Sequence, residues 1–127
     1  MRRFITAEQT LHSTDRYVDY WLACEFLTAQ TKKVGGLHSR IATAIAPHFG
    51  RKSKKGTELI KNAFGLKDLY NLRTEILHHG VEEVPDSSLT KIRDLARELI
   101  RLEFGLPPME KSSLSEMLVR SENAKGQ

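Results

Sequence analysis

The sequence has 127 residues, enough for one domain with a single hydrophobic core and too few for two. Hydrophobic residues make up 39% and charged residues 28%, and no apolar stretch is long enough to span a bilayer. The net charge of +4 permits a polyanionic partner without requiring one. No apolar signal segment follows Arg2-Arg3, and the single cysteine, Cys24, has no disulfide partner. We therefore expect a soluble, cytoplasmic protein with an inert, buried thiol.

The first half of the chain predicts two helices after an N-terminal arm at residues 1–13. The first helix is expected to use Ser13 or Thr14 as its N-cap and to run to about Gln30. It is apolar on nearly every side, which is typical of a helix in the middle of a core. After Gly35-Gly36, a second helix is expected from Leu37 to Phe49. Apolar residues recur at three- and four-residue spacing without strand-like alternation, so the predicted fold is all-α.

A basic loop, Arg51-Lys52-Ser53-Lys54-Lys55, separates this half from a third predicted helix. That helix spans roughly Thr57 to His79, and Gly65 is a position where it should kink or split, since glycine costs about 1 kcal/mol relative to alanine inside a helix. Gly80 is a natural residue to end it.

The last part of the chain predicts one long helix and one short helix. A turn at 85–88 opens the long helix, whose inward face carries Leu89, Ile92, Leu95, Ala96 and Leu99 and whose other face is charged. Pro107-Pro108 ends that unit. We expect a helical domain at 14–105, an extension with a short fifth helix at 106–120, and a disordered tail at 121–127. The predicted architecture is a single-domain bundle of four to five helices.

Arg73 breaks the pattern of the third helix. With Leu69 at zero and 100° per residue, the apolar arc runs from about 300° to about 100°, and Arg73 falls inside it at about 40°. An arginine stays charged, so in such a place it needs a partner. Glu25 is equally out of place on an apolar side of the first helix. We therefore predict that Glu25 and Arg73 approach each other within about 6 Å.

The same pair has a purely structural interpretation, in which a buried ion pair fixes the register of two helices in a helical adaptor. The neighbouring histidines favour a functional site. His78 lies about 140° round the helix from Arg73, so it should point out of the monomer's core. Histidine exchanges protons near neutral pH, as acid-base catalysis requires.

The run from Asp68 to Gly80, DLYNLRTEILHHG, resembles the signature of HEPN domains, specifically the Apea-like branch with its "lYxlRsxivHG" string. The wider HEPN mark is an arginine and a histidine separated by four to six residues; four separate Arg73 from His78, and five separate it from His79. Residues 21–27 and 37–50 also resemble the apolar and following helical segments of that family. The resemblance covers about residues 14 to 104.

The resemblance implies an α-helical, usually dimeric protein from a group that includes many metal-independent endoribonucleases of toxin-antitoxin and antiviral defence systems. Other members only bind RNA or serve as scaffolds. It implies RNA as the substrate, an antitoxin or sensor as a further partner, and a composite site formed by two protomers. His78 would act on the ribose 2′-OH or the leaving 5′ oxygen, and Arg73 would stabilise the phosphorane, which leaves a 2′,3′-cyclic phosphate.

Two positions depart from that pattern. Thr74 follows the arginine where the family often has Asn, Asp or Ser, and the doubled histidine leaves the assignment between His78 and His79 open, with His78 preferred for its spacing. Tyr70 and Glu25 are expected to support the site. Gly80 stands where some HEPN toxins carry a tyrosine modified by AMPylation, so that route of control is not expected.

Two further groups of residues were considered. Arg51, Lys52, Lys54 and Lys55 can contact RNA phosphates without sequence choice, or they can form a solvated loop. His48, His78 and His79 suggest a metal site, but adjacent histidines on a helix diverge by about 100° and no acidic or cysteine spacing completes a zinc set. We expect neither a metal nor another cofactor.

Overall fold

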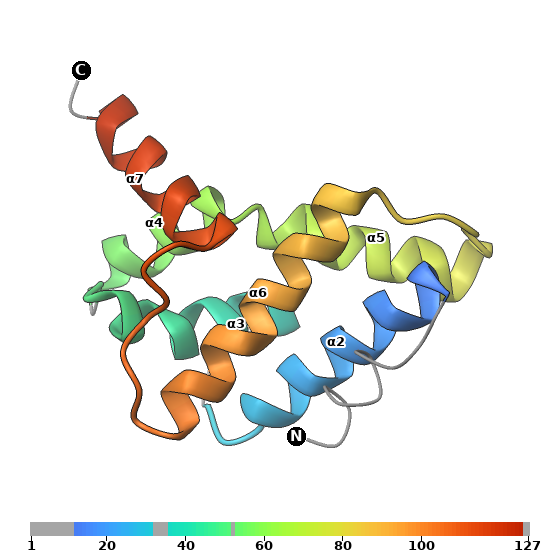
Figure 1. Cartoon of the computed structure of the whole chain (residues 1–127), viewed down its shortest axis with the longest axis horizontal. Coiled ribbons are helices and arrows are strands. Elements are labelled where there is room, and N and C mark those ends of the chain that lie inside the picture. Colours follow the sequence, from blue (N-terminus) through green and yellow to red (C-terminus); the bar gives the residue numbers. More distant parts are fainter. Residues whose placement is uncertain (1–11, 32–35, 52, 126–127) are drawn as a thin grey trace.

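A computed structural model describes residues 12–31, 36–51 and 53–125, and these residues form helices without a strand. The prediction of a small all-α fold is confirmed. The helices are α2 (Ser13–Leu27), α3 (Leu37–Ile45), the 3-10 helix η1 (Ala46–Phe49), α4 (Lys54–Ala63), α5 (Leu66–His79), α6 (Asp86–Glu103) and α7 (Ser113–Lys125). Figure 1 shows α6 crossing the middle of the bundle, with α2 beside it and α5 across one end.

One apolar core joins all the helices. Its largest fully buried side chains come from α2, α3, α4, α5, α6, α7 and the turn after α4: Tyr17, Tyr20, Trp21, Ile41, Ile45, Ile60, Phe64, Leu66, Ile92, Leu95 and Leu114. Four of the five residues predicted to face inward from α6 are buried, and Leu89 is partly buried. Leu114 and Leu118 place α7 on this same core, while its far end projects from the bundle (Figure 1).

Two expectations for α2 are wrong. The N-cap is His12, without a side-chain hydrogen bond, and Ser13 is already helical. The helix is also not enclosed on all sides, because Phe26 is 72% exposed while Tyr17, Tyr20 and Trp21 are buried. Residues 1–11 of the expected arm lie outside the described residues, while His12 caps α2 and Ser13 belongs to it.

The chain breaks near the predicted glycines. Gly65 has a left-handed φ of 58° and divides α4 from α5, and Gly80, with φ 65°, ends α5 directly after His79. Only residues without a Cβ penalty adopt this conformation readily. These two glycines set both the start and the end of the helix that carries Arg73, His78 and His79.

Two boundaries differ from the prediction. The side chain of Ser53 caps α4 by accepting a hydrogen bond from the Gly56 N–H, so Lys54 and Lys55 belong to the first turn of that helix rather than to a loop. The tail expected to be disordered from Ser121 instead continues α7 to Lys125. Each helix starts after a serine whose hydroxyl accepts a hydrogen bond from an N–H of the first turn, Ser53 from Gly56 and Ser112 from Ser115.

Candidate functional site

Arg73 and Glu25 meet between α5 and α2. The Nη2 atom of Arg73 lies 3.9 Å from the Oε2 atom of Glu25, which confirms the predicted approach. The pair is not enclosed in the core, however, because the Glu25 side chain is 47% exposed and the Arg73 side chain 20% exposed. Such a pair contributes little to stability, typically below about 1 kcal/mol. The pair therefore lies where a ligand can reach it.

An aromatic cluster holds the other side of Arg73. Its Cζ atom lies 5.6 Å from the centroid of the Tyr70 ring, and the Trp21 ring packs edge-on against Tyr70 at 5.9 Å. The Nε atom of Arg73 is buried without a hydrogen-bond partner among the described residues. The guanidinium is thus oriented by an ion pair and a ring while donors remain for another acceptor.

Glu25 is itself fixed by a second arginine. Arg40 of α3 donates from Nη2 to the Glu25 carbonyl oxygen at 3.1 Å and from Nε to the Thr28 hydroxyl at 3.2 Å. The Thr28 hydroxyl also donates to the carbonyl oxygen of Cys24 at 2.8 Å. These bonds hold the backbone at the end of α2, from which the Glu25 side chain extends toward Arg73.

His78 and His79 occupy the exposed C-terminal turn of α5, as predicted for His78. In the part of the chain that the structure describes, neither imidazole contacts Arg73 or accepts or donates a hydrogen bond. Thr74, which follows the arginine, donates a hydrogen bond from Oγ1 to the Tyr70 carbonyl oxygen at 3.3 Å. Its hydroxyl proton is therefore engaged within the helix. The structure brings Glu25, Tyr70 and Arg73 together, and it leaves the histidines apart from them.

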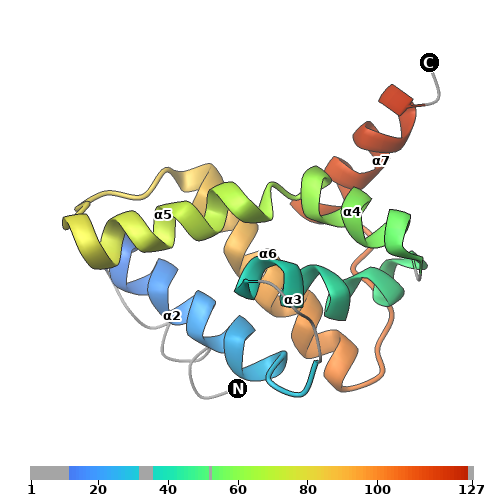
Figure 2. The same cartoon turned by 180° about the vertical axis from the view of Figure 1, so that it is seen from behind.

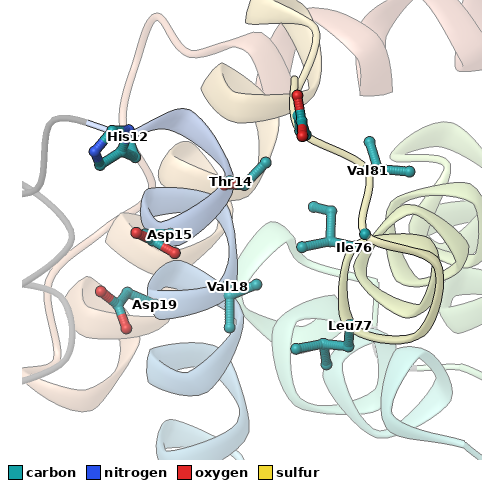
Figure 3. Close-up of a pocket in the computed structure, with 10 residues that line it drawn as sticks. His12, Thr14, Asp15, Val18, Asp19, Ile76, Leu77 and Val81 are labelled. Carbon is teal, nitrogen blue, oxygen red and sulfur yellow. The ribbon is translucent and has the colours of Figure 1, made fainter.

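A groove of about 920 Å³ lies beside the histidine end of α5, between it and the start of α2 (Figure 3). Val18, Ile76, Leu77 and Val81 give it apolar walls. Its polar lining includes three carboxylates, from Asp15, Asp19 and Glu82, and the imidazole of His12, whereas His78 and His79 do not line it. A groove with this lining disfavours a polyanion.

The predicted basic loop is partly engaged in internal contacts. Arg51 forms an ion pair with Glu122 of α7 and donates from Nη1 to the Phe49 carbonyl oxygen at 3.3 Å. Lys54 and Lys55 are exposed, and Lys52 lies outside the described residues. The start of α4, which carries Lys54 and Lys55, lies on the side of the bundle away from α5 (Figure 2).

The sequence patterns missed an imidazole that belongs to the Tyr70 cluster. The ring of His38, in the first turn of α3, lies 5.6 Å from the Tyr70 ring at an interplanar angle of 45°. Burial and the ammonium groups of Lys61 and Lys67 lower the pKa of His38. The sequence did not indicate this contact. His38 follows the glycines that precede α3, and helix periodicity does not relate it to Arg73 on α5.

A second missed group is the buried pair of His48 and Glu98. His48 Nε2 lies 3.5 Å from Glu98 Oε2, and the two side chains are 3% and 0% exposed. Burial raises the pKa of Glu98, and burial with nearby Arg101 lowers that of His48. Glu98 also accepts a hydrogen bond from the Met109 N–H at 3.0 Å. His48 is therefore engaged in the helix packing.

Among the described residues, no group of three histidine, cysteine, aspartate or glutamate side chains is arranged to hold a metal ion. Cys24 is fully buried, and burial raises the pKa of its thiol, so it is a poor nucleophile. No described helix combines the length and the apolar character needed to cross a membrane. Comparison of the chain with protein-family models, with curated proteins and with solved structures gave no match.

Proposed function

We propose that this chain is a metal-independent endoribonuclease of the HEPN type that acts as a homodimer. The observation that carries the proposal is the oriented but accessible guanidinium of Arg73, on the same helix as two exposed histidines at its C-terminal end. The resemblance of residues 68–80 to the Apea-like signature supplies the reaction class. A cytoplasmic role in toxin-antitoxin or antiviral defence, with an antitoxin or sensor as partner, belongs to the same proposal.

The proposed reaction needs no cofactor. His78 accepts the proton of a ribose 2′-OH, and the 2′ oxygen attacks the adjacent phosphorus. Arg73 stabilises the negative charge of the phosphorane with its N–H donors. The bond from phosphorus to the 5′ oxygen then breaks, and that oxygen takes up a proton, which leaves a 2′,3′-cyclic phosphate and a 5′-hydroxyl. His79 is the alternative acid-base residue, and Glu25, Tyr70 and Thr74 keep their supporting roles.

The proposal includes a second protomer because one protomer does not bring Arg73 and a histidine to the same phosphodiester. Arg73 and His78 diverge by about 140° round α5, so one phosphodiester does not contact both within a protomer. Phe26 and Leu77, on α2 and α5, are 72% and 50% exposed, and they offer apolar surface for such a contact. The same exposed side chains favour the alternative function, a catalytically silent module for RNA binding or dimerisation.

The test is cleavage of labelled RNA in EDTA by the wild type and by His78→Ala, His79→Ala and Arg73→Ala. Acid-base catalysis contributes about 10² to 10⁴ in rate, so loss of the acting histidine should lower cleavage at least that far. Mass spectrometry of the products should find 2′,3′-cyclic phosphate ends. Equal cleavage by every variant would identify a contaminating nuclease, whereas binding without cleavage would favour the silent module.

A further inference from the structure

One face of α5 connects the histidine end to a lysine end. Lys67, Asn71, Thr74 and His78 follow one another at steps of four, three and four residues, so they fall within about 60° of each other round the helix. Lys67, Asn71 and His78 are exposed, and Thr74 is partly exposed. This face, called the α5 stripe below, is about 16 Å long and carries no carboxylate.

At the lysine end, the stripe continues into a second charged surface. Lys67 and Lys61 of α4 line the same pocket, of about 330 Å³, beside Gly65 at the junction of the two helices. Both ammonium groups act on His38, whose ring packs on Tyr70, the residue that also supports Arg73. The lysine end and the Arg73 cluster are therefore linked through His38 and Tyr70.

The two ends of the stripe differ in the charge that lies beyond them. Past His78, the groove of Figure 3 is lined by the carboxylates of Asp15, Asp19 and Glu82. Past Lys67, the pocket contains two ammonium groups with the carboxylates of Glu58 and Asp68. The two ammonium groups and two carboxylates of this pocket balance, so a phosphate chain that passes His78 meets less negative charge along α5 than on the groove side.

We propose that Lys61 and Lys67 bind backbone phosphates of a single-stranded RNA that runs along the α5 stripe from the cleavage site at His78. This subsite rests on the proposed ribonuclease function, and it names the ligand of that site and the direction in which the strand extends. His38 and Tyr70 act as positioning residues that keep the α3 and α5 sides of the surface together. Glu58 and Asp68 moderate the affinity.

The test measures binding separately from cleavage. A fluorescently labelled pool of 2′-O-methylated RNA of random sequence lacks the attacking hydroxyl, so anisotropy reports the Kd of the uncleaved strand. For single strands, each neutralised phosphate contributes about 0.7 to the slope of log K against log salt concentration. K61Q/K67Q should therefore lower the slope by about 1.4. Between 50 and 200 mM salt, its affinity should fall about sevenfold less than that of the wild type.

The matched control, K91Q/K111Q, removes two lysines from α6 and from the segment before α7 and should leave the slope unchanged. E58Q/D68N should strengthen binding, because it removes the carboxylates from the pocket. Circular dichroism checks that each variant keeps its helices. In cleavage of long unmodified RNA, K61Q/K67Q should raise KM with little effect on kcat.

An unchanged slope in K61Q/K67Q, an equal loss in the control, or no binding by the wild type would overturn the subsite. Cleavage is scored independently with unmodified RNA. A wild type that binds the methylated pool with the expected slope but cleaves nothing would overturn the ribonuclease proposal and keep the phosphate subsite.

Discussion

Two contacts between elements, Arg73–Glu25 and His48–Glu98, each place a basic side chain against a carboxyl group, and their surroundings differ. Arg73 and Glu25 lie at the edge of the bundle, with the carboxylate about half exposed. His48 and Glu98 lie inside it, where η1 meets α6 and the segment that leads to α7. Water screens the charges of Arg73 and Glu25, whereas it is excluded from His48 and Glu98. The two contacts therefore have different roles. The accessible pair suits a ligand, and the buried pair suits attachment of the C-terminal segment.

The hydrogen bonds around each pair support that distinction. Arg73 Nε, His48 Nε2 and Glu98 Oε2 all lack a hydrogen-bond partner among the described residues, but only beside the buried pair do two α6 carboxyl groups, of Asp94 and Glu98, bind the chain that leads into α7. Glu98 accepts from the Met109 N–H, and Asp94 accepts from the N–H and hydroxyl of Ser113 at 3.1 and 2.6 Å. Removal of a charge should therefore affect stability at one place and activity at the other.

The largest effect on stability is expected for Glu98→Ala. It leaves the Met109 N–H without its acceptor and His48 without its partner in a water-excluded place. A buried donor left without its acceptor costs about 1 to 3 kcal/mol. Urea unfolding should report that loss, and Glu98→Gln, which keeps an acceptor for Met109, should lose less. A loss below about 1 kcal/mol for the alanine variant would contradict a structural role for this pair.

The largest effect on activity with little change in stability is expected for Arg73→Lys. Lysine can keep the ion pair with half-exposed Glu25, but it loses the planar fork that presents several donors to a phosphorane. Loss of one such donor lowers the rate by about 10² to 10³. Single-turnover cleavage and urea unfolding should be measured on one preparation. A wild-type rate would contradict the role of Arg73, as would destabilisation as large as that of Glu98→Ala.

The buried pair should also produce two opposite dependences of stability on pH. The pKa of Glu98 is raised above its ordinary 4.5, so the native state binds its proton more tightly and this contribution falls as pH rises above 4.5. The pKa of His48 is lowered below its ordinary 6.5, so its contribution falls as pH drops below 6.5. Arg101 disfavours the charged His48, while Asp94 disfavours the ionised Glu98 and Arg101 favours it.

Single variants separate the two contributions. The unfolding free energy of Glu98→Gln minus that of the wild type should rise with pH from 4.5 to 6.5, because the falling contribution of Glu98 is removed. The corresponding difference for His48→Gln should fall over the same range. Urea unfolding at several pH values checks both signs. Parallel curves for all three proteins would contradict the directions of both pKa shifts.

The accessible pair was predictable from the sequence, whereas the buried pair was not. Arg73 falls inside an apolar arc, and a charge in that position needs a partner, which left Glu25 as the other misplaced charge. Relative to Ile92, however, Asp94 and Glu98 fall at about 200° and 240°, on the flank that the helix pattern assigns to solvent. They are buried by Met109, Ser113 and α7, and packing of a distant segment leaves no periodic signal.

The same limit explains the other differences in α2 and α4. Because α2 is apolar on nearly every side, its sequence does not indicate which side packs against the other helices. The exposure of Phe26 was therefore not predictable. The Ser53 cap extended α4 over Lys54 and Lys55, because a serine before two lysines fits a loop and a helix start equally well. Glycine positions were more informative, since a left-handed φ at Gly65 and Gly80 is a local requirement.

The smallest effect is expected for the third cross-helix pair, Arg51 and Glu122. Both side chains are about one third exposed, and such pairs typically contribute about 0 to 1 kcal/mol. A double-mutant cycle with Arg51→Ala and Glu122→Ala, followed by urea unfolding, measures the coupling alone. A coupling below about 1 kcal/mol, beside the larger loss for Glu98→Ala, would mean that α7 is held mainly by the α6 carboxylates. A coupling above about 3 kcal/mol would reverse that assignment, because exposure would then no longer separate the strong pairs from the weak ones.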